Sequence, residues 1–146
     1  MRYRTLGRTG LIVSEVSLGT MQFGKNMLGN LDQAATTRMV KLALDRGITF
    51  IDTADVYTRG ESESLLGNAL KGMRDEVVLA TKVRMPMSDN FNRSGATRVN
   101  IMRGIESSLK RLQTDHWIST RSIAGTPARR LRRRAGPLTT WCARVK

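Results

Sequence analysis

The sequence is poor in several features that would define a class of protein. It has one cysteine, Cys142, which excludes an internal disulfide framework. No apolar run approaches the roughly 20 residues that a membrane-spanning helix needs, and the first residues have no apolar core typical of a signal peptide. We therefore expect a cytoplasmic protein, and 146 residues suffice for one modest domain with a hydrophobic core.

Acidic residues are missing from the last part of the chain. Residues 116–146 contain eight Lys or Arg and no Asp or Glu, whereas residues 1–115 contain 17 Lys or Arg and all 12 acids. The net charge of +13 would by itself suggest a nucleic-acid-binding protein. The excess belongs to the tail, whose basic run at residues 129–134 has no interleaved aromatics and matches no recognised binding motif. A nucleic-acid-binding arm is therefore only the alternative interpretation.

The first 112 residues alternate strand-like and helix-like patterns. We predict a hairpin from residues 3–6 and 11–13, strands at 16–18, 48–53 and 77–81, and helices after Asp32, after Ser62 or Ser64, and over 97–112. The expected buried positions are Ala35, Met39, Leu42 and Ala43 in the first helix, Leu65, Leu66, Ala69 and Leu70 in the second, and Val99, Met102, Ile105, Leu109 and Leu112 in the third. This β-α-β-α-β-α order predicts a parallel sheet, either open or part of a barrel.

Three chemically useful side chains follow the predicted strands. Asp52 ends one apolar run, Tyr57 lies five residues further on, and Lys82 ends the next run. Because the ends of neighbouring parallel strands meet at one edge, we expect these groups to converge, as they do in α/β barrels. Each also has a structural alternative: a turn or cap for Asp52, a packed surface aromatic for Tyr57 and a solvated lysine for Lys82.

The motifs around these residues resemble the aldo-keto reductase family. The match consists of Phe-Ile-Asp-Thr-Ala-Asp-Val-Tyr at 50–57, the Tyr-x-x-Gly-x-Ser-Glu pattern at 57–63, and Ala-Thr-Lys at 80–82. The resemblance extends from Tyr3 to Asp115 and implies the N-terminal part of a (β/α)8 TIM barrel. Since a full barrel usually needs about 250 residues, we expect a partial barrel at 1–115, with a hairpin and about three βα units. An irregular tail is expected at 116–146.

The resemblance also implies an activity, which is the NADPH-dependent reduction of a small aldehyde or ketone. Tyr57 would be the general acid, supported by the charge of Lys82, with Asp52 holding the lysine. Gly19, Thr20, Met21 and Asp52 would lie by the cofactor, and no metal is expected. Met21 and Phe23 could also line the substrate pocket, although plain loop packing is an equally good interpretation.

The family pattern breaks off after Asp115. A member would continue with Tyr-Ile-Asp-Leu-Tyr-Gln-Ile-His, which ends in the catalytic histidine, whereas this chain reads His-Trp-Ile-Ser-Thr-Arg-Ser-Ile from His116. Codons for the tail can be regrouped from the third base of codon 117 to restore Asp-Leu-Tyr-Gln-Ile-His. We therefore hypothesise a one-base deletion near codons 116–117, which sequencing of the encoding DNA would test. On this interpretation His116 is incidental, and the chain is a truncated, poorly active form, a non-catalytic fragment or an interaction protein.

Overall fold

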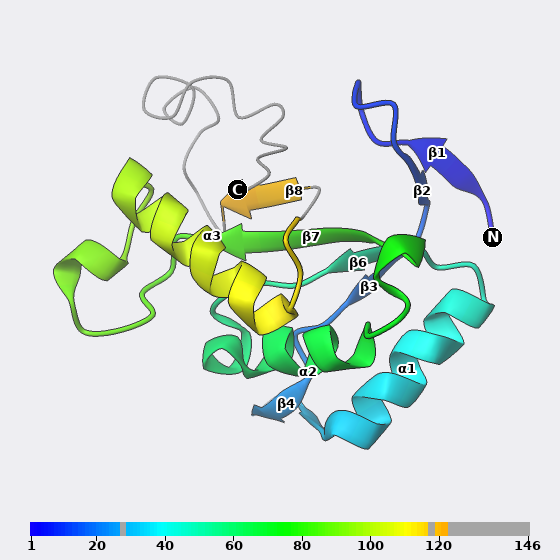
Figure 1. The fold of residues 1–146 in the computed structure, drawn as a ribbon, viewed down its shortest axis with the longest axis horizontal. Coiled ribbons are helices and arrows are strands. Elements are labelled where there is room, and N and C mark those ends of the chain that lie inside the picture. The colour runs from blue at the N-terminus through cyan, green and yellow to red at the C-terminus, as the bar shows by residue number, and fades with distance from the viewer. Residues whose placement is uncertain (27–28, 117–118, 123–146) are drawn as a thin grey trace.

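A computed structural model of the chain describes residues 1–26, 29–116 and 119–122 (Figure 1). The strands are β1 (Tyr3–Thr5), β2 (Ile12–Ser14), β3 (Ser17–Gly19), β4 (Gly24–Asn26), β5 (Gly29–Leu31), β6 (Phe50–Asp52), β7 (Val78–Val83) and β8 (Ser119–Ser122). The helices are α1 (Gln33–Asp45), α2 (Glu61–Ala69) and α3 (Arg98–Leu112), with short 3₁₀ turns η1 (Tyr57–Gly60), η2 (Arg74–Glu76) and η3 (Phe91–Arg93).

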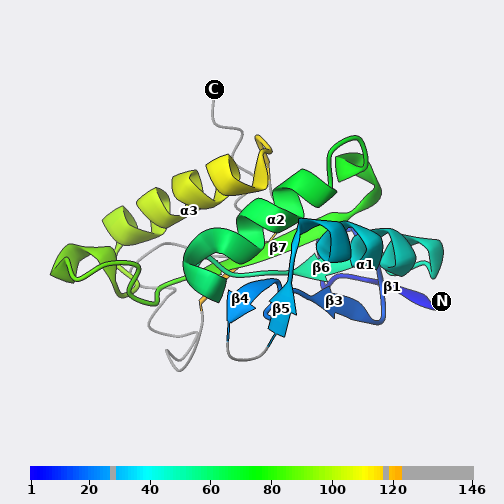
Figure 2. The same ribbon diagram turned by 90° about the horizontal axis from the view of Figure 1, so that it is seen from below.

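The central feature is a parallel sheet in the order β3-β6-β7-β8. Helices α1, α2 and α3 cover one face of this sheet, and α2 lies between the other two (Figure 2). Each crossover from one strand to its neighbour therefore passes through a helix, which is the βαβ arrangement that the sequence predicts. The described residues form an arc of parallel strands with helices outside it, as in part of a (β/α)8 barrel.

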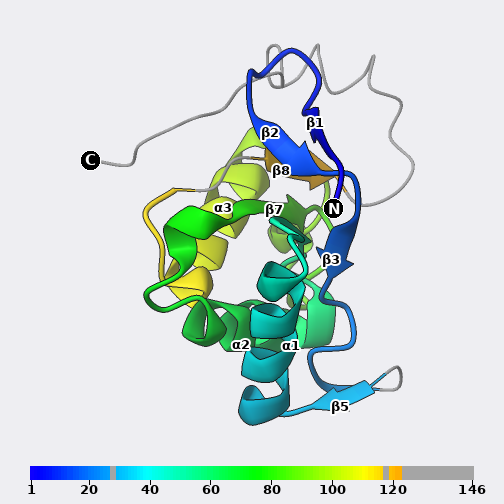
Figure 3. The ribbon, with the colours of Figure 1, turned by 90° about the vertical axis from the view of Figure 1, so that its right-hand side faces the viewer.

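Two small antiparallel hairpins flank the sheet (Figure 3). The predicted hairpin is β1–β2, and Ser14 at its end accepts hydrogen bonds from the amides of Thr49 and Phe50 at 3.1 and 3.2 Å. This contact places the hairpin at the start of β6, the end of the sheet opposite the strand ends that carry Asp52 and Lys82. The second hairpin, β4–β5, is not predicted by the sequence patterns.

The N-cap expected at Asp32 is confirmed, and α3 has Thr97 as its N-cap, at the residue where the predicted third helix begins. Asp32 Oδ1 accepts from the Ala35 amide at 2.7 Å, and Thr97 Oγ1 accepts from the Asn100 amide at 3.2 Å, as N-cap side chains do. The expectation that Ser62 or Ser64 caps α2 is wrong. The N-cap is Gly60, at φ 93°, because the chain enters the helix two to four residues earlier through a left-handed turn.

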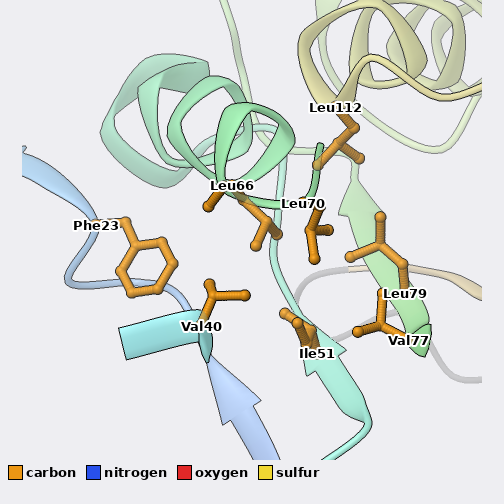
Figure 4. Close-up of a cluster of buried hydrophobic side chains, with 9 residues drawn as sticks. Phe23, Val40, Ile51, Leu66, Leu70, Val77, Leu79 and Leu112 are labelled. Atoms are coloured by element: carbon orange, nitrogen blue, oxygen red, sulfur yellow. The ribbon is translucent and has the colours of Figure 1, made fainter. Parts of the chain in front are cut away.

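The hydrophobic core lies between the sheet and the three helices (Figure 4). Its fully or almost fully buried members are Phe23, Val40, Ile51, Leu66, Ala69, Leu70, Val77, Leu79 and Leu112. Most of the predicted buried positions of α2 and the C-terminal half of α3 are confirmed. In α1 the buried position of Ala43 is confirmed, but Met39 and Leu42 are wrong, because they are 38% and 54% exposed while Thr36 and Val40 are buried.

The error in α1 has a simple origin. Apolar residues occur on two adjacent faces of this helix, and the sequence pattern does not say which face contacts β6 and α2. The buried stripe of Thr36, Val40 and Ala43 includes a polar residue, so it has the weaker apolar signal. Val99, at 56% exposed, is likewise outside the buried face of α3, which in the first turn of that helix is occupied by Asn100.

The prediction that regular structure ends near Asp115 is wrong over residues 119–122. These residues form β8, which pairs in parallel with β7 from Ala80 opposite Ser119 to Val83 opposite Ser122. Strand pairing uses backbone amides and carbonyls, so the open edge of β7 can accept a segment that lacks alternating apolar side chains. The rest of the predicted irregular tail, residues 123–146, lies outside the described residues, and the domain boundary at 115/116 stays a prediction.

Helix α2 lies directly against the backbone of α3 at Gly67. A Cβ atom on this residue would lie 2.6 Å from the Arg111 carbonyl oxygen and 2.7 Å from the Leu112 carbonyl carbon. Both are backbone atoms and cannot rotate away. The absence of a side chain at Gly67 therefore sets the distance between α2 and α3.

We expect Gly67→Ala to destabilise the fold by about 1–3 kcal/mol, because overpacking forces the two helices apart. In a helix without this contact, the same change would stabilise by roughly 1 kcal/mol. Urea unfolding followed by circular dichroism measures the difference, with the exposed α1 substitution Lys41→Ala as the control. A Gly67→Ala protein as stable as the parent would contradict the close approach.

Candidate active site

The candidate site lies at the C-terminal ends of β6 and β7. Asp52 is the last residue of β6 and pairs with Ala80, so Lys82 lies two residues further along β7. The segment after β6 stays alongside β7, since the Thr53 amide donates to the Ala80 carbonyl at 2.9 Å and the Asp55 amide donates to the Lys82 carbonyl at 3.0 Å. This alignment brings the acid and the amine to the same edge of the sheet.

Lys82 is the centre of the site. Its Nζ donates to Asp52 Oδ2 at 2.5 Å, to the Thr53 carbonyl at 2.9 Å and to the Tyr57 hydroxyl oxygen at 3.0 Å. The ammonium also lies 4.7 Å from the centroid of the Tyr57 ring. The side chains of Lys82 and Asp52 are only 13% and 22% exposed, so the charge pair is partly shielded from water. The predicted convergence of Asp52, Tyr57 and Lys82 is confirmed.

A strained turn places Tyr57 over the lysine. Thr58 and Arg59 have φ values of 49° and 53°, and Gly60 follows at 93°. Left-handed backbone at non-glycine residues costs on the order of 1 kcal/mol each and is common at functional sites. The Thr58 hydroxyl donates to the Phe23 carbonyl at 2.9 Å, which ties this turn to the loop after β3.

The predicted cofactor-binding residues lie at the end of β3, beside Asp52. Gly19 pairs with Asp52, and an added Cβ at Gly19 would meet no atom within 4 Å. Thr20 is fully buried, and Ser62 Oγ donates to both its carbonyl and its hydroxyl oxygen, at 2.8 and 3.0 Å. Met21 is 43% exposed. Gly19 and Met21 are thus accessible, whereas Thr20 serves the packing of α2 against β3.

Two other residues considered from the sequence have structural positions. Phe23 is fully buried in the core, so the expectation that it lines a substrate pocket is wrong and loop packing accounts for it. Its neighbours there include Val40 and Leu66 (Figure 4). His116 Nδ1 lies 2.6 Å from Asp115 Oδ1 on an exposed stretch after α3. The position near 123, where the family pattern has its histidine, lies outside the described residues.

Sequence reasoning missed a buried polar group behind the site. Glu63 is fully buried; its Oε1 accepts from Thr81 Oγ1 at 2.6 Å, and its Oε2 pairs with Arg111. Asp55 is also buried, and its Oδ1 has no hydrogen-bond partner among the described residues. Burial, followed by the nearby Glu63 carboxylate, raises the pKa of Asp55 to about 6. Both acids stand in the matched motifs, but no spacing rule indicates that they are buried.

The described residues contain no helix long and apolar enough to cross a membrane. In the same part of the chain, no three His, Cys, Asp or Glu side chains gather in a group that could hold a metal ion.

The strand-end acid, phenol and amine on a partial barrel agree with the comparison with protein families. The chain belongs to the aldo/keto reductase family, whose model matches residues 15–117. It is similar to the aldo-keto reductase YhdN of Bacillus subtilis, with 42% identity over 118 residues, covering 80% of this chain and 36% of YhdN. It is also similar to a probable voltage-gated potassium channel subunit beta of Oryza sativa, with 35% identity over 120 residues, covering 80% of this chain and 35% of that protein.

Solved structures agree with this assignment. The holo form of the aldo-keto reductase AKR11C1 from Bacillus halodurans superposes with a TM-score of 0.75 and 34% identity, covering 86% of this chain and 41% of that chain. The chain thus spans less than half the length of these relatives. The fold class predicted from the sequence, the N-terminal part of a TIM barrel, is confirmed.

The shifted Asp55 pKa gives a prediction about stability. Because the folded-state pKa of about 6 exceeds the ordinary value of 3.8, Asp55 favours folding most below pH 3.8, and this contribution falls as the pH rises through 6. Asp55→Asn should therefore be more stable than the parent at pH 7 to 8 by about 1–3 kcal/mol, and the difference should vanish near pH 4.

Urea unfolding at several pH values measures this, with the exposed Asp89→Asn as the control that should show no such trend. If Asp55→Asn were less stable than the parent at pH 8, the buried, unfavourable charge at Asp55 would be disproved.

Proposed function

We propose that the Asp52–Tyr57–Lys82 site belongs to an NADPH-dependent reductase of aldehydes and ketones. The observation that carries the proposal is the Lys82 ammonium held within hydrogen-bond distance of both Asp52 Oδ2 and the Tyr57 hydroxyl. A phenol has an ordinary pKa near 10 and gives up its proton readily only beside a cation. The site supplies that cation in a fixed position.

The residues divide the work as follows. Tyr57 donates its hydroxyl proton to the carbonyl oxygen of the substrate, and the Lys82 charge stabilises the phenolate that remains. Asp52 and the Thr53 carbonyl hold the ammonium, so little rearrangement is needed during the proton transfer. The Tyr57 proton is restored from solvent after the alcohol leaves.

The residues present fit the nicotinamide end of the cofactor. Asp52 Oδ1 is buried and has no hydrogen-bond partner among the described residues, so it is available to a ligand hydroxyl. Gly19 leaves open space beside it, and the exposed Met21 lies two residues on. When bound, NADPH would supply the hydride. Asp52, Gly19 and Met21 include no cationic group for its phosphates, and the family's phosphate-binding residues lie mostly in its C-terminal third.

We therefore expect this chain to have little or no reductase activity, and to act in the cytoplasm as a truncated form of the enzyme. NADPH consumption with a panel of aldehydes and ketones would measure it, against a version whose reading frame is restored at codons 116–117. Turnover by this chain within about tenfold of the restored enzyme, a barrier difference of only ~1.4 kcal/mol, would contradict the proposal.

The role of Tyr57 is tested in the restored enzyme. Tyr57→Phe removes the proton donor and should lower kcat by about 10²- to 10⁴-fold. The matched control is Tyr3→Phe, because Tyr3 lies in β1 and is half exposed. Equal losses in the two variants would remove Tyr57 from the reaction.

A second candidate is a non-catalytic interaction protein. The similarity to a potassium channel subunit beta favours it, since that relative is named for its place in a channel. The basic tail adds a possible nucleic-acid contact, although its run at residues 129–134 lies outside the described residues. Titration with NADPH separates the reductase from this candidate, and a salt-dependent mobility shift with RNA or DNA tests the tail.

A further inference from the structure

The first turn of α2 carries two adjacent buried side chains that reach the ends of three strands. Ser62 donates to Thr20, at the end of β3, and its Oγ lies 3.5 Å from Thr53 Oγ1, just after β6. Glu63 accepts from Thr81, on β7. The segment after β6, which binds the Lys82 ammonium, and strand β7, which carries Lys82, are therefore both bonded to the first turn of α2.

Glu63 has both of its carboxylate oxygens occupied. Oε1 accepts from Thr81 Oγ1 at 2.6 Å, while Oε2 accepts from Arg111 Nε at 2.8 Å and lies 2.7 Å from its second guanidinium nitrogen. A buried carboxylate is tolerated only when it is paired and hydrogen-bonded. Joining α2 to α3 would need only the arginine, so the contact with β7 is an additional connection.

The contact at Thr81 fixes the direction of Lys82. Successive side chains of a strand point to opposite faces. Thr81 is held on the helix side by Glu63, and Val83 packs against Ile105 of α3 on that same side. Lys82, between them, must point to the other side, where Asp52 and Tyr57 lie.

The same ion pair also contacts the turn after Tyr57. A Cβ atom at Gly60 would lie 2.7 Å from Arg111 Cδ and 2.8 Å from its Nε. Because Gly60 ends the left-handed turn and begins α2, Arg111 packs directly against the segment that places Tyr57. One buried pair thus touches the supports of both the phenol and the amine.

We propose that Glu63 is a positioning residue for the Lys82–Tyr57 contact and acts through Thr81. It touches neither substrate nor cofactor, and the inference deepens the proposed function on which it rests. Strand β7 is bonded to its neighbours through its backbone, so the Thr81 hydrogen bond adds a side-chain contact that holds this part of β7 against α2. Without it, small shifts of the Lys82 backbone are less restrained, and the flexible lysine side chain carries them to Nζ. A shift of about 1 Å is enough to weaken a site of this kind.

The test needs no substrate or cofactor. The chain has two tyrosines, Tyr3 and Tyr57. In a Tyr3→Phe background labelled with ¹³C at the tyrosine Cζ, the single NMR signal reports the surroundings of the Tyr57 hydroxyl. Lys82→Met in this background gives the position of the signal when the ammonium contact is lost.

Two substitutions at one position separate the hydroxyl from the side-chain volume. Thr81→Val removes the hydroxyl and should move the signal by about half or more of the distance to the Lys82→Met position, whereas Thr81→Ser keeps the hydroxyl and should leave it near the parent. Glu63→Gln should move it in the same direction as Thr81→Val. The control is Leu66→Val, a core substitution in α2 that lowers stability without touching Thr81.

Equal signals from Thr81→Val and Thr81→Ser, or a shift as large in Leu66→Val, would overturn the proposal. If neither Thr81→Val nor Glu63→Gln folds while Thr81→Ser does, the bond is a requirement of folding rather than of positioning, which also overturns it. An unmoved signal in Lys82→Met would show that the Lys82–Tyr57 contact is absent, and both this inference and the proposed function would fail. If these shifts are found but the enzyme with the restored reading frame shows no reductase turnover, the positioning role stands and only the proposed activity fails.

Discussion

The half-buried ammonium of Lys82 is the group on which the rest of the site depends. It is held by a carboxylate, a backbone carbonyl and a phenol hydroxyl that come from the end of β6 and the turn after it. Each partner reaches the lysine only because β6 and β7 are parallel and in a register that leaves Lys82 beyond the end of β6. A charge taken partly out of water requires such partners. The register of β6 and β7 supplies them, so the same strand pairing that builds the sheet also stabilises the charged lysine.

The helical layer serves the same constraint from the other face of the sheet. Helix α2 begins directly after the turn that carries Tyr57, and its first residues contact β3, the segment after β6, and β7. Gly67 then lets α3 approach closely enough for Arg111 to pair with Glu63. The polar contacts behind the strands and the reactive groups in front of them are thus built from alternate residues of the same short segments.

The sequence is informative where a pattern has one physical solution. The strand order, the cap at Asp32, and the meeting of Asp52, Tyr57 and Lys82 follow from period, capping chemistry and parallel strand ends. It is less informative where two solutions compete. Helix α1 has two apolar faces, and packing against α2 selects the one with Thr36. Ser62 looks like a cap, but its hydroxyl is used to join α2 to Thr20. The burial of Glu63 and Asp55 depends on tertiary neighbours and leaves no local signal.

Strand β8 has the position of a barrel strand but not its usual side-chain pattern. Its four residues, Ser-Thr-Arg-Ser, occupy the place beside β7 without the apolar alternation of a barrel strand. The open edge of a sheet binds a new strand through backbone amides and carbonyls, so the pairing depends little on the side chains of that strand. In such a sheet, a strand can keep its position even when its side chains no longer match those of a barrel strand. Backbone pairing alone thus fills the place of a barrel strand, whether or not its side chains supply a functional group.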